Sequence, residues 1–193
     1  SKEAFEKAVA ELDAAIPTLQ PHQVVVRLQQ IAALVGDGHT GVHTPDAFKR
    51  YPVALWWFGN ELRVTGAGKE YPQALGARVL EIGGMPLDEV QARVSRCFPS
   101  AENENAWYVL STSVAFLTMP EVLQTLGVVP DLGPATFTLQ ADGGEPFDLA
   151  ITPVALAQEN VGPALRLTPA VREEPLFRQR MNEAFWFTYL PES

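Results

Sequence analysis

The hydrophobic period of this sequence first changes at the glycine-rich segment 36–45. Before that segment, apolar residues recur every three or four positions over residues 2–16 and 22–35, a spacing typical of amphipathic helices. Pro17 is expected to end the first helix and Gly36 the second. After the segment the period is two, which indicates β-strands. We therefore expect a helical hairpin followed by a part that contains a sheet.

The second part is expected to combine strands with helices. Its most definite element is a β-hairpin that turns at Gly59-Asn60, because this pair tolerates the positive φ angles of a two-residue turn. The expected strands cover residues 51–58, 61–65, 77–82, 135–140 and 147–153, and the expected helices cover residues 87–97, 105–117 and 120–126. This order predicts an α+β fold in which an N-terminal helical hairpin precedes a β module with inserted helices.

Residues 158–193 follow a third pattern. Three prolines interrupt residues 158–180, which predicts an extended connector. Residues 184–190, with the sequence AFWFTYL, are apolar and typical of a strand. Because a strand of this composition needs a sheet to join, we expect it to pair with a sheet outside this sequence or to support self-association.

Composition excludes several classes of partner. With 47% hydrophobic residues among 193, the chain can bury a core and is not disordered. Its net charge of -9 comes without a basic stripe, so neither nucleic acid nor an anionic membrane surface is an expected partner. No apolar run reaches the length of a membrane span. The single cysteine, Cys97, excludes a disulfide within the chain.

Asp37, His39 and His43 form the densest cluster of polar side chains that could carry chemistry. A metal site is the first hypothesis, but the glycines around them disfavour a helix, and in an extended chain positions four apart lie about 13 Å from each other. Neither a metal nor a cofactor is therefore expected. The same glycines free the backbone to present the imidazole of His39, which readily accepts a proton near neutral pH. On composition alone, a His39 that caps or packs against a helix end is the alternative.

A nucleophile is not expected within these residues. No serine lies in a G-x-S-x-G elbow, and the serines are Ser1, Ser95, Ser100, Ser111, Ser113 and Ser193. Cys97 lacks the local signature of a catalytic thiol and is interpreted as a small buried hydrophobic residue.

Three segments in order resemble the front part of the tail-specific, carboxyl-terminal-processing serine peptidases and their tricorn-like relatives. They are LVGDGHTGV at residues 34–42, YPVALWWFGNELRV at residues 51–64 and GARVLEIGGMPLDEV at residues 76–90. In that family a helical pair leads to a D-x-H-T motif. A PDZ-like module follows, and its signature is a glycine, a strand ending in I-x-G and a helix.

This resemblance implies a role for His39. In the tricorn-like branch, the histidine of the motif is the general base for a serine that comes much later, in an α/β core, assisted by a second serine and a glutamate. The residue before that histidine is also a serine in the tricorn-like pattern, whereas this sequence has Gly38. Other branches use a lysine as the base, and their histidine need not be catalytic. His39 is accordingly the one catalytic candidate that the resemblance implies.

The resemblance also implies a division of the chain and a function. Residues 1–50 would form the helical hairpin ending in GDGHT, residues 51–157 a PDZ-like module with a helical insert at 102–127, and residues 158–193 a connector and first strand toward a missing core. The chain would be the substrate-recognising N-terminal portion of a serine peptidase, inactive alone, acting on peptides or proteins in an extracytoplasmic compartment. The alternative is a stand-alone PDZ-like peptide-binding or scaffolding module, which should bury residues 184–190 within itself.

Overall fold

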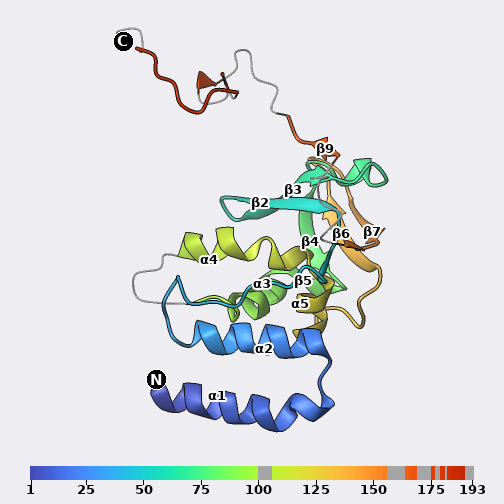
Figure 1. The fold of residues 1–193 in the computed structure, drawn as a ribbon. Coiled ribbons are helices and arrows are strands. Elements are labelled where there is room, and N and C mark those ends of the chain that lie inside the picture. Colours follow the sequence, from blue (N-terminus) through green and yellow to red (C-terminus); the bar gives the residue numbers. More distant parts are fainter. Residues whose placement is uncertain (100–105, 156–163, 169–174, 177–178, 181, 190–193) are drawn as a thin grey trace.

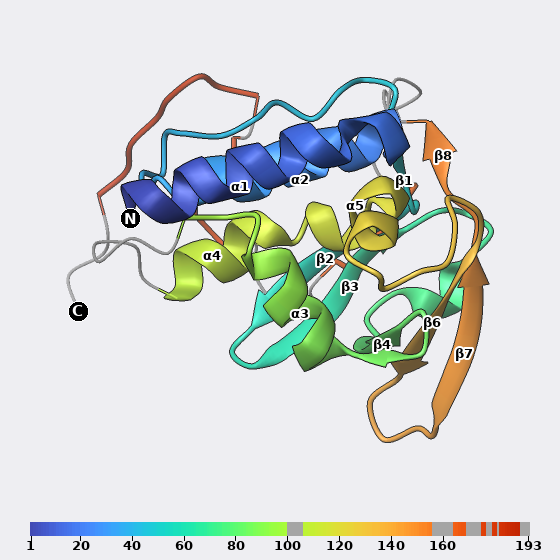
Figure 2. The same ribbon diagram turned by 90° about the horizontal axis from the view of Figure 1, so that it is seen from below.

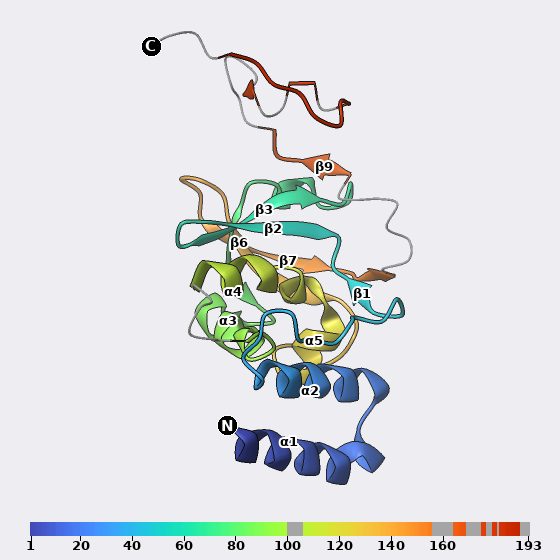
Figure 3. The same cartoon turned by 60° about the vertical axis from the view of Figure 1, so that its left-hand side comes forward.

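A computed structural model of the chain describes residues 1–99, 106–155, 164–168, 175–176, 179–180 and 182–189. Figure 1 and Figure 3 show successive layers: a pair of N-terminal helices, a second group of helices, and then an antiparallel sheet. The predicted α+β fold with an N-terminal helix pair is confirmed. No helix within the described ranges combines the length and apolar character that crossing a bilayer requires.

The N-terminal pair consists of α1 (Lys2–Ala15) and α2 (Pro21–Ala33), joined by a 3-10 turn (Ile16–Thr18). Figure 1 shows the two helices lying side by side. Pro21 occupies the first turn of α2, where its missing N–H removes no helical hydrogen bond. On its other side, α2 packs against α5 (Pro120–Thr125), where His22 Nε2 lies 2.9 Å from Gln124 Oε1.

The sheet follows the order β2-β3-β4-β6-β7, with every pair antiparallel. These strands are β2 (Val53–Phe58), β3 (Glu61–Ala67), β4 (Arg78–Ile82), β6 (Ala135–Gln140) and β7 (Pro146–Ile151). Short strands complete the sheets: β5 (Met85–Pro86) beside β4, β9 (Leu165–Arg166) beside β3, and a separate pair formed by β1 (Lys49–Arg50) and β8 (Val154–Ala155). The predicted hairpin is present, and Gly59 adopts the positive φ of 62° that its turn requires.

The helices α3 (Leu87–Ser95), α4 (Ala106–Ser113) and α5 cover the inner face of the sheet together with a 3-10 turn (Phe116–Thr118). Residue 105, where the first inserted helix was expected to begin, lies outside the described residues. The main core joins inner strand residues to helix residues and includes Leu55, Leu62, Val79, Val90, Val94, Leu123, Phe137 and Leu139. Alternation along β2 buries Trp57 and leaves Trp56 and Phe58 exposed on the outer face.

Two predictions at the C-terminal end are tested only in part by the described residues. Residues 184–189 form no strand, and Leu190 lies outside the described residues. Within the described residues this segment has no neighbouring strand to supply hydrogen bonds, and three of its aromatic side chains, Phe185, Phe187 and Tyr189, face solvent. The connector predicted over 158–180 is only partly described, and the described part contains β9, which adds to the edge of β3. A two-residue strand is too short to produce an alternating pattern in the sequence.

Candidate functional site

His39 lies on the segment 36–45, called here the His39 loop, which runs from the end of α2 toward β1 (Figure 2). Gly36 leaves α2 with a φ of 78°, a conformation that strongly favours glycine. Asp37 then holds a local turn: its Oδ2 accepts a hydrogen bond from Thr40 Oγ1 at 2.8 Å, and its Oδ1 accepts one from the His39 backbone N–H at 3.3 Å. The turn is closed by Thr40 N, which donates to the carbonyl of Asp37.

The imidazole of His39 stands in solvent beside this carboxylate. Its side chain is 99% exposed, and its Nδ1 lies 3.5 Å from Asp37 Oδ1. A carboxylate beside Nδ1 favours the tautomer that carries its proton there, which leaves the Nε2 lone pair facing outward. The alternative in which His39 packs against a helix end does not match this exposure.

The electrostatics of Asp37 suit an orienting role. Hydrogen bonds from the Thr40 hydroxyl, and then from the His39 backbone N–H, lower the pKa of the Asp37 carboxyl below its ordinary value. Asp37 therefore stays ionised at neutral pH, and its negative charge remains beside the ring of His39 whenever that ring accepts a proton.

Two side chains outside the His39 loop, one from α2 and one from α4, bind its backbone. Neither was predicted from the sequence. Tyr108 of α4 donates from its hydroxyl to the carbonyl of Gly38 at 3.3 Å. Gln29 of α2 accepts a hydrogen bond on Oε1 from the N–H of Val42 at 2.6 Å. A glutamine among the buried positions of an amphipathic helix is the signal that could have indicated Gln29, whereas nothing near Tyr108 in the sequence points to its contact.

The cluster predicted around His39 is only partly assembled. Asp37 and His39 meet, whereas His43 is another exposed residue of the same loop, and the remaining histidine, His22, contacts α5. Within the described ranges, no group of three or more His, Cys, Asp and Glu side chains is placed to hold a metal ion.

The described serines are engaged in local contacts. Ser113 is buried and bonds Gln91, Ser95 accepts a hydrogen bond from the same glutamine, and Ser111 donates to the carbonyl of Tyr108. Ser1 accepts from the first turn of α1, and Ser100 and Ser193 lie outside the described residues.

The thiol of Cys97 is poorly suited to act as a nucleophile. Cys97 is fully buried, and this burial raises the pKa of its thiol to about 12, so the reactive thiolate is scarce at neutral pH. The His39 loop therefore offers a base, and the hydrogen bonds given above for the described serines lead to residues outside this loop.

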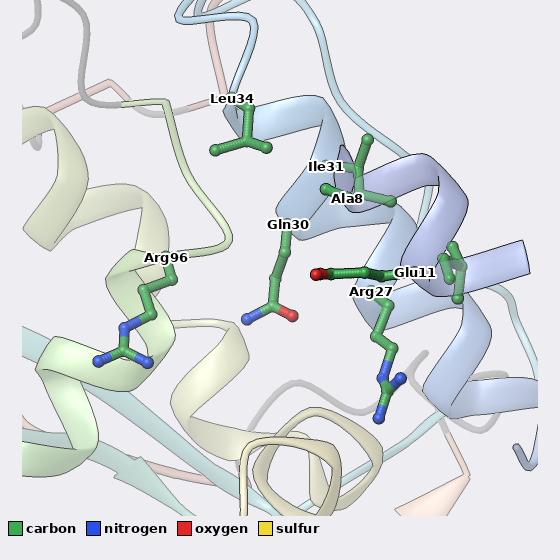
Figure 4. Close-up of a pocket in the computed structure, with 8 residues that line it drawn as sticks. Ala8, Glu11, Arg27, Gln30, Ile31, Leu34 and Arg96 are labelled. Atoms are coloured by element: carbon green, nitrogen blue, oxygen red, sulfur yellow. The ribbon is translucent and has the colours of Figure 1, made fainter. Parts of the chain in front are cut away.

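A cavity of about 410 Å³ lies between α1, α2 and the end of α3. Figure 4 shows the amide of Gln30 between the side chains of Arg96 and Arg27, with Glu11 of α1 beside them. The rest of the lining is apolar and consists of Ala8, Leu12, Ile31 and Leu34. The cavity contains no histidine, serine or cysteine, so the candidate for proton transfer remains the His39 loop.

Comparison with known proteins gives matches to solved structures. No protein-family model matches the sequence, and neither does any curated protein. A complex of mature CPAF with lactacystin aligns with 76% of this chain at a TM-score of 0.54 and 16% identity. CPAF is a chlamydial serine protease of the tail-specific protease-like kind. This chain has a tail-specific protease-like fold.

Two further CPAF structures agree with this match. Mature CPAF aligns at a TM-score of 0.53 and a mutant of CPAF at 0.54, both at 16% identity and over 76% of this chain. The chain spans only 28% of the length of the CPAF chain in the lactacystin complex. At this level of identity, the likeness establishes the fold alone.

Proposed function

We propose that this chain is the N-terminal, substrate-recognising portion of a serine peptidase of the tail-specific family, which hydrolyses peptide bonds when joined to a catalytic core. The observation that carries the proposal is the exposed imidazole of His39 beside Asp37, on a fold shared with a serine protease. Since the fold matches 28% of the CPAF chain, the nucleophile is proposed to belong to the remaining part of such an enzyme. The likeness to CPAF gives no support to the tricorn-like branch, so its assisting serine and glutamate are not included.

His39 is proposed to act as the general base. Its outward-facing Nε2 would take the proton from a serine hydroxyl while the serine oxygen attacks the carbonyl carbon of the scissile peptide bond. The same proton would then pass to the leaving amine as the carbon–nitrogen bond breaks. Asp37 would orient the ring through Nδ1 and stabilise the imidazolium that forms in between.

Substrate recognition is proposed to belong to residues 51–157, read as a PDZ-like module with the insert 102–127. Such modules bind an extended peptide by adding it as a strand to an open sheet edge. β2 is the outermost strand on its side of the sheet, and α4 of the insert packs against both β2 and α3. A peptide at this edge would therefore lie close to α4, whose Tyr108 contacts the His39 loop.

The exposure of aromatic side chains in residues 182–189 distinguishes the enzyme proposal from the alternative of a stand-alone module. Phe185, Phe187 and Tyr189 are 91%, 81% and 90% exposed. A stand-alone module should have buried these rings, because several exposed aromatics close together are costly in water and typical of a contact surface. Their exposure supports a segment that joins a catalytic core or a second copy, and Figure 3 shows it standing away from the sheet.

The proposal predicts a difference between the chain alone and the full-length protein. Residues 1–193 alone should not cleave unstructured peptides, because they contribute a base without a nucleophile. The full-length protein should cleave them and should be blocked by a serine-reactive inhibitor. Robust inhibitor-sensitive cleavage by residues 1–193 alone would contradict the proposal.

A further inference from the structure

Both ends of the Gln29 amide are bonded to backbone groups from different parts of the chain. The side chain lies on α2 and is 8% exposed. Its Nε2 donates to the carbonyl of Cys97 at 2.9 Å, and its Oε1 accepts from the N–H of Val42 at 2.6 Å. Gly41 packs directly on this amide, since a Cβ at that position would lie 3.6 Å from Nε2. One side chain therefore joins α2, the His39 loop and the end of α3.

The two backbone groups that Gln29 satisfies lie in irregular structure. Cys97 lies beyond Ser95, the last residue of α3, and Val42 lies in a loop without a strand partner among the described residues. A buried polar group that loses its partner costs free energy, so the positions of Val42 and Cys97 are tied to that of Gln29. Cys97 is itself fully buried in the second core cluster, which makes its carbonyl a fixed point.

We propose that Gln29 is a positioning residue for His39, which fixes the His39 loop against the buried end of α3. Gln29 holds the loop at Val42, on the C-terminal side of His39, and Tyr108 holds it at Gly38, on the N-terminal side. The ring is exposed and has Asp37 beside its Nδ1, so these two backbone contacts act together with that carboxylate to determine where its Nε2 stands. The two hydrogen bonds of Gln29 do not depend on any activity, whereas their effect on catalysis rests on the proposed function.

Gln29→Met tests the tie, because methionine keeps the length of the side chain and removes both hydrogen bonds. Gln30→Met is the matched control: Gln30 is the next residue of α2, and its amide faces the open cavity. Amide hydrogen exchange of residues 1–193 followed by NMR should show Val42 exchanging about tenfold faster or more in Gln29→Met. Gln30→Met should leave that rate unchanged. Unchanged exchange of Val42 in Gln29→Met would overturn the inference.

Two further variants keep the test decisive. If Gln29→Met does not fold, Gln29→Asn serves instead, because its shorter amide cannot reach both backbone groups, and the same outcomes apply. At about pH 4, where a buried carboxyl is protonated, Gln29→Glu keeps an acceptor for Val42 and a donor for Cys97 and should restore slow exchange of Val42. Failure of Gln29→Glu to protect Val42 would contradict the assigned hydrogen bond.

Kinetics of the full-length protein test the catalytic consequence. Gln29→Met should lower kcat with little change in KM, and Gln30→Met should change neither. A loosened loop with unchanged kcat would overturn the positioning role. If His39→Ala leaves cleavage intact while Gln29→Met still exposes Val42, the proposed function fails and only the structural tie remains.

Discussion

Replacing His39 by alanine in the full-length protein is expected to lower kcat/KM for peptide cleavage by about 10³-fold, within the roughly 10²–10⁴-fold range of general-base catalysis. The loss should fall on kcat, because the ring would accept a proton in the transition state without contributing to substrate binding. The fold should be unaffected, since the side chain is 99% exposed and only its Nδ1 approaches Asp37. Steady-state kinetics with an unstructured peptide would measure the effect, and circular dichroism would verify the fold.

His43→Ala is the matched control for this experiment. His43 is an exposed histidine of the same loop, four positions further along, so its removal changes the local charge and composition in the same way. It should leave kcat/KM within about twofold of the parent protein, as expected for a surface substitution away from the reacting atoms. Equal losses in the two variants, or full activity in His39→Ala, would remove His39 from the catalytic group.

The largest loss of stability is expected for Gly83→Ala, in the Gly83-Gly84 turn after β4. Gly83 has a φ of 64°, and a Cβ there would lie 2.4 Å from the backbone carbonyl oxygen of Val128, a contact that the backbone must move to relieve. Its N–H also donates to the carbonyl of Thr136 at 2.8 Å, so a shift would disturb β6. We expect the free energy of unfolding to fall by about 3 kcal/mol or more, from the positive φ and the overpacking together.

Gly84→Ala separates the two causes. Gly84 also has a positive φ, of 76°, but a Cβ there would meet no atom within 4 Å. Only the conformational cost applies, so the free energy of unfolding should fall by about 1 kcal/mol. Urea unfolding of residues 1–193 followed by fluorescence would measure both variants. Equal losses would contradict the close approach of Gly83 to Val128.

Much of the fold could be predicted from the sequence because local pattern and turn chemistry agree there. The two N-terminal helices, the hairpin at Gly59-Asn60 and α5 follow from periodicity and from Gly or Pro at their ends, whereas the helix expected over 105–117 ends early, with α4 at Ser113. The short strands β1, β8 and β9 could not be predicted, because they exist only through pairing with partners distant in the sequence. Residues 184–189 form no strand among the described residues, and the predicted pairing with a sheet outside this sequence stays a prediction, since strand propensity says nothing about the presence of a sheet to join.

Of the candidate site, the local turn could be predicted from the sequence, and the side chains that hold it from outside could not. Asp37 and His39 are two residues apart, so their contact follows from a local turn that the glycines permit. The anchors of the loop were not predictable, because Gln29 lies 13 positions from Val42 and Tyr108 lies 70 positions from Gly38. Only the packing of α2 and α4 brings these side chains to the loop.

His39 is proposed to be the general base for a serine nucleophile that lies outside residues 1–193. The most direct measurement is to label the full-length protein with a serine-reactive phosphonate and to identify the modified residue by peptide mass spectrometry. The account predicts a single labelled serine outside residues 1–193, with labelling strongly slowed by His39→Ala and unaffected by His43→Ala. A label on a serine within residues 1–193, or labelling at an unchanged rate in His39→Ala, would contradict it.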